Sequence, residues 1–309
     1  MRQLFAATAL LATTSAAGAA PPQVLADTPV AASLVALVSG DLARPEILLP
    51  AGSSAHHYQM RPSDAAALQS ADLLVWFGPE LTPWLSKAAS AGGGADLELL
   101  HVTGTRLRGY DPDEAADDQN HPQDDAGDDH DGHDHAGTDP HAWLNPANAG
   151  PWLAAIAARL SELDPGNAGT YSANAEAAAG ALARMDAEIA RELAPVRGQS
   201  FVVLHDAYGY FTDHYELPPA IAVSLGDAAG PSAARLTEVR SRIAQSGAAC
   251  AFPEQAQNSK LIRTAIDGSD VSLGKPLDPS GTALAVGPGL YEDLIRTIAR
   301  TLLECLSAR

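Results

Sequence analysis

Basic residues are scarce in this sequence. Its 309 residues include 19 Lys and Arg against 38 Asp and Glu, which gives a formal net charge of -19. Because proteins that bind nucleic acids contact the phosphates through basic patches, this balance excludes a nucleic acid as the expected partner. The acidity is also local, since residues 111–139 hold twelve of the 38 acidic residues and no Lys or Arg. The rest of the surface is therefore expected to be only mildly acidic.

The sequence also lacks a membrane-spanning stretch. Its first apolar run, Leu4–Leu11, falls well short of the roughly 20 apolar residues that cross a bilayer. One charged residue, Arg2, precedes this run, and small residues follow it up to Pro21, which is the order of a secretory signal peptide. We therefore expect residues 1–20 to be a signal peptide and the mature protein to be free in the periplasm. No cysteine lies at the cleavage region to carry a lipid.

Only two cysteines are present, Cys250 and Cys305. Their wide separation excludes a metal-binding CxxC pair. In an oxidising compartment an even count of two indicates one disulfide, and the helical spacing of the final segment turns Cys305 inward. Two buried free thiols are the alternative that the sequence leaves open.

Short apolar runs alternate with helical patterns in two blocks of the chain. About 290 residues remain after the signal peptide, which is enough for two domains. Because helical patterns separate the runs, each block predicts a mostly parallel sheet flanked by helices, so the expected fold class is α/β with two lobes. The strand candidates are Gln23–Ala26, Glu46–Leu49, Leu73–Phe77 and Leu97–Val102 in the first block, and Phe201–Leu204, Ala220–Ser224, Cys250–Phe252 and Val271–Leu273 in the second.

A long Ala-rich segment separates the two blocks. Apolar residues recur in it every three or four positions from Tyr171 to Leu193, which predicts an amphipathic helix of about seven turns. A single long helix as the joint implies a stiff hinge. The expected organisation is a first lobe over residues 21–165, a linking helix over 166–195 and a second lobe over 196–309.

Residues 111–139 interrupt the first lobe with a different composition. Asp, His, Gly, Ala and Gln dominate, and no apolar periodicity is present. Such a segment cannot bury enough surface to offset the entropy of ordering it, so we expect a disordered surface loop. Four of the ten histidines lie in it: His121, His130, His133 and His135.

Three further histidines and one aspartate are candidate metal ligands. His56 and His205 each follow a strand candidate, one in each lobe, and ligands of open α/β sheets bind outside the carboxyl ends of strands. Asp278 follows the last strand candidate, and His141 follows the acidic loop. Three imidazoles and one carboxylate suit tetrahedral Zn2+, whereas Mn2+ or Mg2+ would call for more oxygen ligands. A histidine after a strand is more often a hydrogen-bonded loop residue, so spacing alone leaves both interpretations open.

Four ordered motifs resemble those of a known family. They are AGSSAHHYQMRPSD (residues 51–64), ADLLVWFGPE (71–80), DPHAWLNP (139–146) and HDAYGYF (205–211). Together they resemble the successive motifs of the metal-binding cluster of ABC-importer substrate-binding proteins, in particular the zinc-binding ZnuA type. The resemblance runs over essentially the whole mature chain. It implies a periplasmic protein, not an enzyme, whose lobes are joined by a rigid helix and which captures one Zn2+ with high affinity.

Carried over by position, the resemblance implies that His56, His141 and His205 are the first, second and third metal ligands. His205 favours zinc, because manganese-type members have Glu at this position. Asp278 matches an aspartate that is the fourth ligand in some relatives and is displaced by water or another residue in others. His57 stands where the family usually has an acid, and we expect it to lie beside the metal site or to be exposed.

The resemblance also implies partners and a covalent link. A monomer is expected to deliver zinc to an ABC permease driven by a cytoplasmic ATPase, and a periplasmic zinc chaperone is a further candidate partner. The disulfide Cys250–Cys305 is expected as in the zinc branch of the family. The acidic loop resembles an insertion of many zinc-type members, which makes it either an auxiliary weak metal-binding arm or a solvated loop with incidental affinity.

Two other functions compete with zinc delivery. A binding protein for manganese, iron or copper, or a zinc buffer, would use a similar site, because selectivity also depends on geometry and metal availability. A zinc hydrolase would need a general base near a metal-bound water. The sequence contains no HExxH motif, and Glu254 is the only acid after a strand that could serve as that base.

Overall fold

Two parallel sheets, one in each lobe, organise the protein, for which we use a computed structural model. The structure describes residues 21–92, 94–110, 137–224, 231–255 and 257–308. The expected signal peptide and the four loop histidines lie outside these residues. The first sheet has the order β2 (Glu46–Ile47), β1 (Val24–Ala26), β3 (Leu73–Trp76) and β4 (Ala95–Glu98). The second has the order β6 (Ile221–Ser224), β5 (Phe201–His205), β7 (Cys250–Phe252) and β8 (Ser272–Leu273).

All six strand pairings are parallel, with registers such as Leu25 opposite Leu74 and Val202 opposite Ala251. Parallel neighbours need crossover connections, and helices supply them in both lobes. The predicted α/β fold class with two lobes is therefore confirmed. In the first lobe these helices are α1 (Pro29–Ser39), α2 (Pro62–Ser70) and α3 (Pro83–Ala91), and in the second α7 (Gly209–His214), α8 (Ala233–Ser246) and α9 (Lys260–Ile266). Helix α5 (Ala149–Leu163) follows β4 and packs against α1 and α6.

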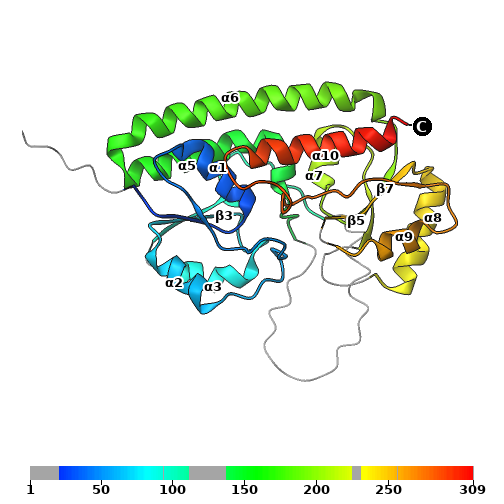
Figure 1. The fold of residues 1–309 in the computed structure, drawn as a ribbon, viewed down its shortest axis with the longest axis horizontal. Coiled ribbons are helices and arrows are strands. Elements are labelled where there is room, and N and C mark those ends of the chain that lie inside the picture. Colours follow the sequence, from blue (N-terminus) through cyan, green and yellow to red (C-terminus); the bar gives the residue numbers. More distant parts are fainter. Residues whose placement is uncertain (1–20, 93, 111–136, 225–230, 256, 309) are drawn as a thin grey trace, which may run out of the picture.

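Helix α6 (Ala168–Leu193) runs along both lobes (Figure 1). Its buried stripe contains the apolar residues that recur from Tyr171 to Leu193 in the sequence. The last helix, α10 (Leu290–Leu306), returns from the second lobe to pack against α6 and α1. At that junction the Ser33 hydroxyl donates to the carbonyl of Pro288 and accepts from the Tyr291 amide, at 3.2 and 3.1 Å. Helices α6 and α10 thus connect the lobes.

Most strand bounds differ by one or two residues from the sequence prediction, and two differences have a reason in the packing. The chain leaves β4 at Glu98 and forms a short 3-10 helix over Leu99–His101, where a strand to residue 102 was expected. Both Leu99 and Leu100 are buried in the same core, which the alternating faces of a strand would prevent. The expected disordered loop is also too long at its end, because Thr138 pairs with Gly109 and Asp139 is fully buried.

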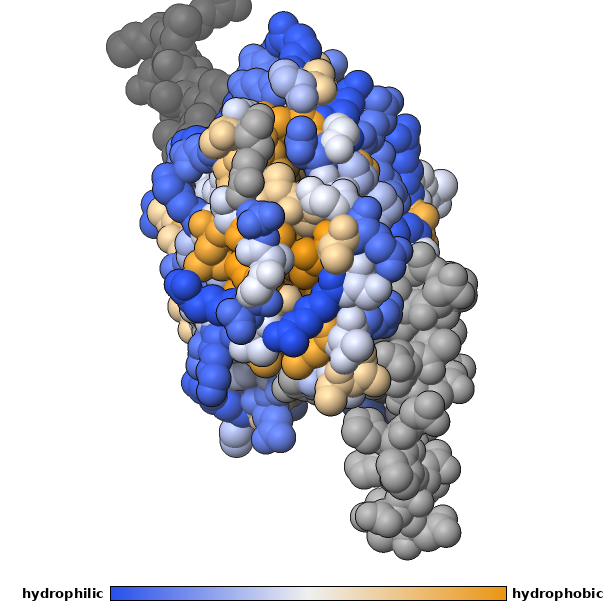
Figure 2. All heavy atoms as spheres, turned by 90° about the vertical axis from the view of Figure 1, so that its right-hand side faces the viewer, coloured by the Kyte–Doolittle hydropathy of each residue, from blue (hydrophilic) through white to orange (hydrophobic). Residues whose placement is uncertain are grey.

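The surface at the end of the second lobe shows hydrophobic residues framed by hydrophilic ones (Figure 2). Helices α8 and α9 pack on the second sheet around a core that includes Val202, Val223 and Ile243.

No helix among the described residues combines the length and apolar character that crossing a bilayer requires.

Asp27 is a fully buried acid at the carboxyl end of β1. Its carboxylate accepts hydrogen bonds from the Thr28 hydroxyl and the Phe77 amide, at 3.0 and 2.9 Å. Burial outweighs these bonds and raises the pKa of Asp27 to about 7. The folded state therefore binds a proton between about pH 4 and pH 7 that the unfolded state releases, so this group makes the protein less stable as the pH rises through that window.

We expect Asp27→Asn to remove this penalty. Relative to the parent protein, its free energy of unfolding should increase as the pH is raised from 4 to 7, by up to about 4 kcal/mol. Urea denaturation of both proteins at several pH values measures the difference. Parallel stability curves over this range would show that Asp27 is ionised in the folded state as readily as in the unfolded chain.

Candidate metal centre

His141 is held in a fixed orientation by a buried carboxylate. It precedes a short 3-10 helix, Ala142–Leu144, and is only 3% exposed. Its backbone N–H and its ring Nδ1 both donate to Oδ1 of Asp139, at 3.0 and 2.8 Å. Because a carboxylate only accepts, the proton of the neutral ring lies on Nδ1 and the lone pair lies on Nε2. This is the tautomer that binds a metal through Nε2.

His205 has the same arrangement in the second lobe. It is the last residue of β5 and is 6% exposed. Its backbone N–H donates to Oε1 of Glu254 at 3.2 Å, and its ring Nδ1 lies 2.7 Å from both carboxylate oxygens. Glu254 follows β7 and forms a bridge to Leu277. Two histidines from different lobes therefore each present Nε2 for coordination.

The three predicted histidines approach one another where the two lobes meet. His56 lies in the turn after β2, and its Nε2 is 3.4 Å from Nε2 of His141. Two nitrogens bound to one tetrahedral Zn2+ at roughly 2.0 to 2.1 Å would be separated by about 3.3 Å. The rings of His141 and His205 have centroids 5.5 Å apart. The separation of His56 from His141 thus matches that of two ligands sharing a zinc ion.

The coordination set is not complete as it stands. Among the described residues, no group of three or more His, Cys, Asp or Glu side chains has the arrangement that could hold a metal ion. Asp278 is not part of such a group. Its carboxylate instead accepts hydrogen bonds within its own loop. The donors are the Ala283 amide at 2.8 Å and the Thr282 hydroxyl at 3.3 Å. In this arrangement the Asp278 carboxylate is therefore engaged by its own loop.

Tyr208 connects Asp278 to the surroundings of His205. Its ring centroid is 6.5 Å from that of His205, and its hydroxyl is buried with no hydrogen-bond partner in the described part of the chain. Burial raises the pKa of Tyr208, and the charges of Glu254 and Asp278 raise it further. The contacts of the Asp278 carboxylate lie within its own loop. His57 is exposed, with its ring centroid 6.2 Å from that of His56.

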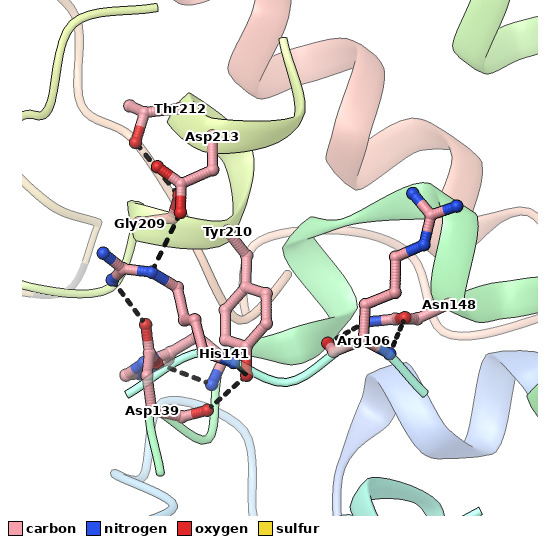
Figure 3. A network of polar contacts seen from close by, with 9 residues as sticks. Arg106, Asp139, His141, Asn148, Gly209, Tyr210, Thr212 and Asp213 are labelled. Atoms are coloured by element: carbon pink, nitrogen blue, oxygen red, sulfur yellow. Dashed lines mark hydrogen bonds and ion pairs between the residues drawn. The ribbon is translucent and has the colours of Figure 1, made fainter. Parts of the chain in front are cut away.

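Sequence reasoning missed the two carboxylates that orient the histidines. Asp139 was placed in the disordered loop, and Glu254 was considered only as the base of a hydrolase. Both positions carried a usable signal. Asp139 lies two residues before a candidate ligand, and Glu254 follows a strand in the same way as the ligands themselves. Figure 3 shows Asp139 beside His141, with Tyr210 of the second lobe nearby.

The comparison with protein families identifies the family of this chain. Residues 24–305 match the family described as "Zinc-uptake complex component A periplasmic". The chain belongs to the ZnuA family. Two curated relatives are named "High-affinity zinc uptake system protein ZnuA". The one from Paracoccus denitrificans is 50% identical over 93% of this chain and 92% of its own length. The one from Yersinia pestis is 33% identical over 88% and 87%.

Solved structures agree with this ZnuA-family fold. A manganese-bound periplasmic metal binding protein from Candidatus Liberibacter asiaticus has a TM-score of 0.74 at 19% identity and covers 92% of this chain and 99% of its own. A laminin-binding adhesin from Streptococcus agalactiae, as a mutant structure, has a TM-score of 0.75 at 23% identity, with the same coverage. At these identities the likeness extends to the fold alone. The family and fold expected from the sequence motifs are confirmed.

Removing the charge of either orienting carboxylate tests its role in the ZnuA-family site. Partners that orient a metal-binding histidine typically contribute about 10-fold to 100-fold to metal affinity, and we expect Asp139→Asn and Glu254→Gln each to weaken zinc binding by that factor. Competitive zinc titration measures the change. Asp164→Asn is the matched control, because Asp164 is also buried and accepts hydrogen bonds from Tyr171 and Asn167. An equal loss in the control would show that any buried carboxylate has this effect.

Proposed function

We propose that this protein captures Zn2+ in the periplasm between its two lobes and delivers it to the permease of an ABC importer. The observation that carries the proposal is the approach of His56, His141 and His205, two of which are oriented by buried carboxylates. Imidazole nitrogens at this spacing suit tetrahedral zinc. The names of the curated relatives, which are zinc uptake proteins, support the same cargo and the same transport system.

The ligands would join the lobes as the ion binds. His56 and His141 belong to the first lobe, whereas His205 and Asp278 belong to the second. Coordination by both groups ties the lobes together, and the small shift that completes the site would distinguish the loaded protein for the permease. Because zinc binds neutral imidazole, acid should weaken the complex and zinc binding should release protons where the rings are protonated. We infer a monomer, and a zinc chaperone in the periplasm as a candidate donor.

A hydrolase is the less supported alternative. Glu254, the acid considered as its general base, is 5% exposed and accepts from the ring and backbone of His205. That geometry suits orientation of a ligand rather than activation of a bound water. A binding role without turnover is therefore the function we propose for this site.

Competitive titration with zinc, manganese and copper tests the proposal. The mature protein and a variant lacking residues 117–135 should both bind one zinc ion tightly, and the complete protein should add weaker sites from its loop histidines. Intrinsic fluorescence is a suitable signal, because the rings of Trp143 and His141 have centroids 5.3 Å apart. Manganese outcompeting zinc would contradict the proposed cargo, and loss of the tight site on loop deletion would contradict the ligand assignment.

A further inference from the structure

Arg108 lies where the first lobe meets helix α7 of the second. Its backbone is paired on both sides: the Asp139 amide donates to its carbonyl at 3.0 Å, and its own amide donates to the Tyr210 hydroxyl at 2.9 Å. That hydroxyl in turn donates to the carbonyl of Asp139 at 2.9 Å. The Tyr210 hydroxyl and the backbones of Arg108 and Asp139 therefore form a closed ring of hydrogen bonds. Figure 3 labels Asp139 and Tyr210 together with His141.

The guanidinium group of Arg108 joins two carboxylates from different lobes. Its Nη1 donates to Oδ2 of Asp139 at 3.2 Å, and its Nε donates to Oδ2 of Asp213 at 3.1 Å. Asp139 uses its other oxygen, Oδ1, for His141. A fully buried carboxylate needs a compensating partner, and Arg108 supplies the positive charge. One carboxylate thus receives a metal ligand on one oxygen and an arginine on the other.

Gly209 makes room for this arrangement. A Cβ atom built at this position would lie 1.7 Å from Nη1 and 2.3 Å from Cζ of Arg108, distances that real atoms do not adopt. The guanidinium therefore lies directly against the first residue of α7, and any side chain there would displace it from this position. Helix α7 begins four residues after His205, the ligand of the second lobe. The contacts run without interruption from His141 through Asp139 and Arg108 to the segment that follows His205.

We infer that Arg108 is a positioning residue for zinc binding, which fixes the Asp139–His141 pair relative to the second lobe and slows release of the ion. The inference rests on the proposed function. Arg108 suits the role because a planar guanidinium reaches two carboxylates at once in fixed directions, which the single ammonium of lysine does not. Its loss removes the charged partner of Asp139, so the orientation of His141 relaxes. It also removes the contact with Asp213, while Tyr210 still links α7 to the first lobe through the backbones of Arg108 and Asp139.

Zinc affinity and dissociation rate of Arg108→Met test the inference. We expect affinity to fall about tenfold, the lower end of what an orienting partner of a metal ligand contributes, mainly through faster dissociation. Asp213→Asn should give a smaller change in the same direction. Asp213 is 60% exposed, so this variant keeps the test valid if loss of Arg108 impairs folding. The matched control is Arg296→Met, since Arg296 also pairs with two acids, Glu188 and Glu292.

A double variant separates positioning from general stability. Because Arg108 acts through Asp139, Arg108→Met should have little further effect on affinity in an Asp139→Asn background. Unchanged zinc binding in Arg108→Met, an equal factor in both backgrounds, or the same loss in Arg296→Met would overturn the inference. Failure of the parent protein to bind zinc would instead overturn the proposed function, so the two outcomes are distinguishable.

Discussion

Alanine in place of His56, His141 or His205 is expected to abolish tight zinc binding. Each variant removes a ligand itself, so the loss should exceed the roughly 100-fold that removal of an orienting partner can cause. The size of the loss should depend on how buried each histidine is and on whether a carboxylate orients its ring. His141 and His205 are each held by a buried carboxylate, whereas His56 lies in a turn and is partly exposed. Loss of either supported ring should therefore have the greater effect. Competitive titration against a chelator of known affinity measures all three.

His57→Ala is the matched control for His56→Ala. The two residues are neighbours, but His57 is exposed, and only His56 has its ring nitrogen 3.4 Å from that of His141. Zinc affinity should therefore change little in His57→Ala. Thermal unfolding in the presence of a chelator checks that each variant folds without metal. If both variants fold and lose the same affinity, His56 is not the specific ligand of this turn, and the assignment is wrong.

The sequence could nominate candidate ligands because strand ends are a local feature. His205 ends β5, Asp278 follows β8 and His56 follows β2, so the rule for open parallel sheets brings them to one side of each lobe. The long helix α6 could also be predicted, since its apolar stripe repeats over many turns. These features depend on neighbours within a few residues along the chain.

The contacts that orient the histidines could not be predicted from the sequence in the same way. Glu254 is 49 residues from His205, and Arg108 is 31 residues from Asp139 and 105 from Asp213. Only the alignment of β5 with β7, and of the first lobe with α7, brings these charges together. The composition of residues 111–139 concealed Asp139 in the same manner, because its burial depends on a cation that the local pattern does not contain.

Removing the disulfide is expected to have the second large effect, on stability. The bond joins Cys250 at the start of β7 to Cys305 in α10, as the sequence predicted. It closes a loop with a sequence separation of 55 residues, for which the chain-entropy model gives about 4 kcal/mol at 25 °C. The double variant Cys250→Ala/Cys305→Ala should lose free energy of unfolding of that order. Urea denaturation followed by far-UV circular dichroism measures it.

The optical probe matters for this experiment. Three of the four tryptophans, Trp76, Trp84 and Trp152, lie within the first lobe, whereas Trp143 also contacts the second through the carbonyl of Pro279. Fluorescence therefore reports mainly on the first lobe, whereas circular dichroism also follows the second. Destabilisation should therefore appear earlier in circular dichroism than in fluorescence if the lobes unfold separately. Coincident transitions would show that α6 and α10 couple the two lobes into one cooperative unit.

Zinc affinity provides the decisive contrast for the disulfide variant. Strand β7 leads directly to Glu254, but its position is also fixed by pairing with β5, where Phe201 lies opposite Cys250 and Val203 opposite Phe252. Under conditions where the variant remains folded, Glu254 should still orient His205, and affinity should stay within a few-fold of the parent. A loss of affinity as large as that of Glu254→Gln would mean that the disulfide, rather than strand pairing, holds the carboxylate in place. Unchanged stability would mean that the open chain already keeps these two cysteines close when unfolded.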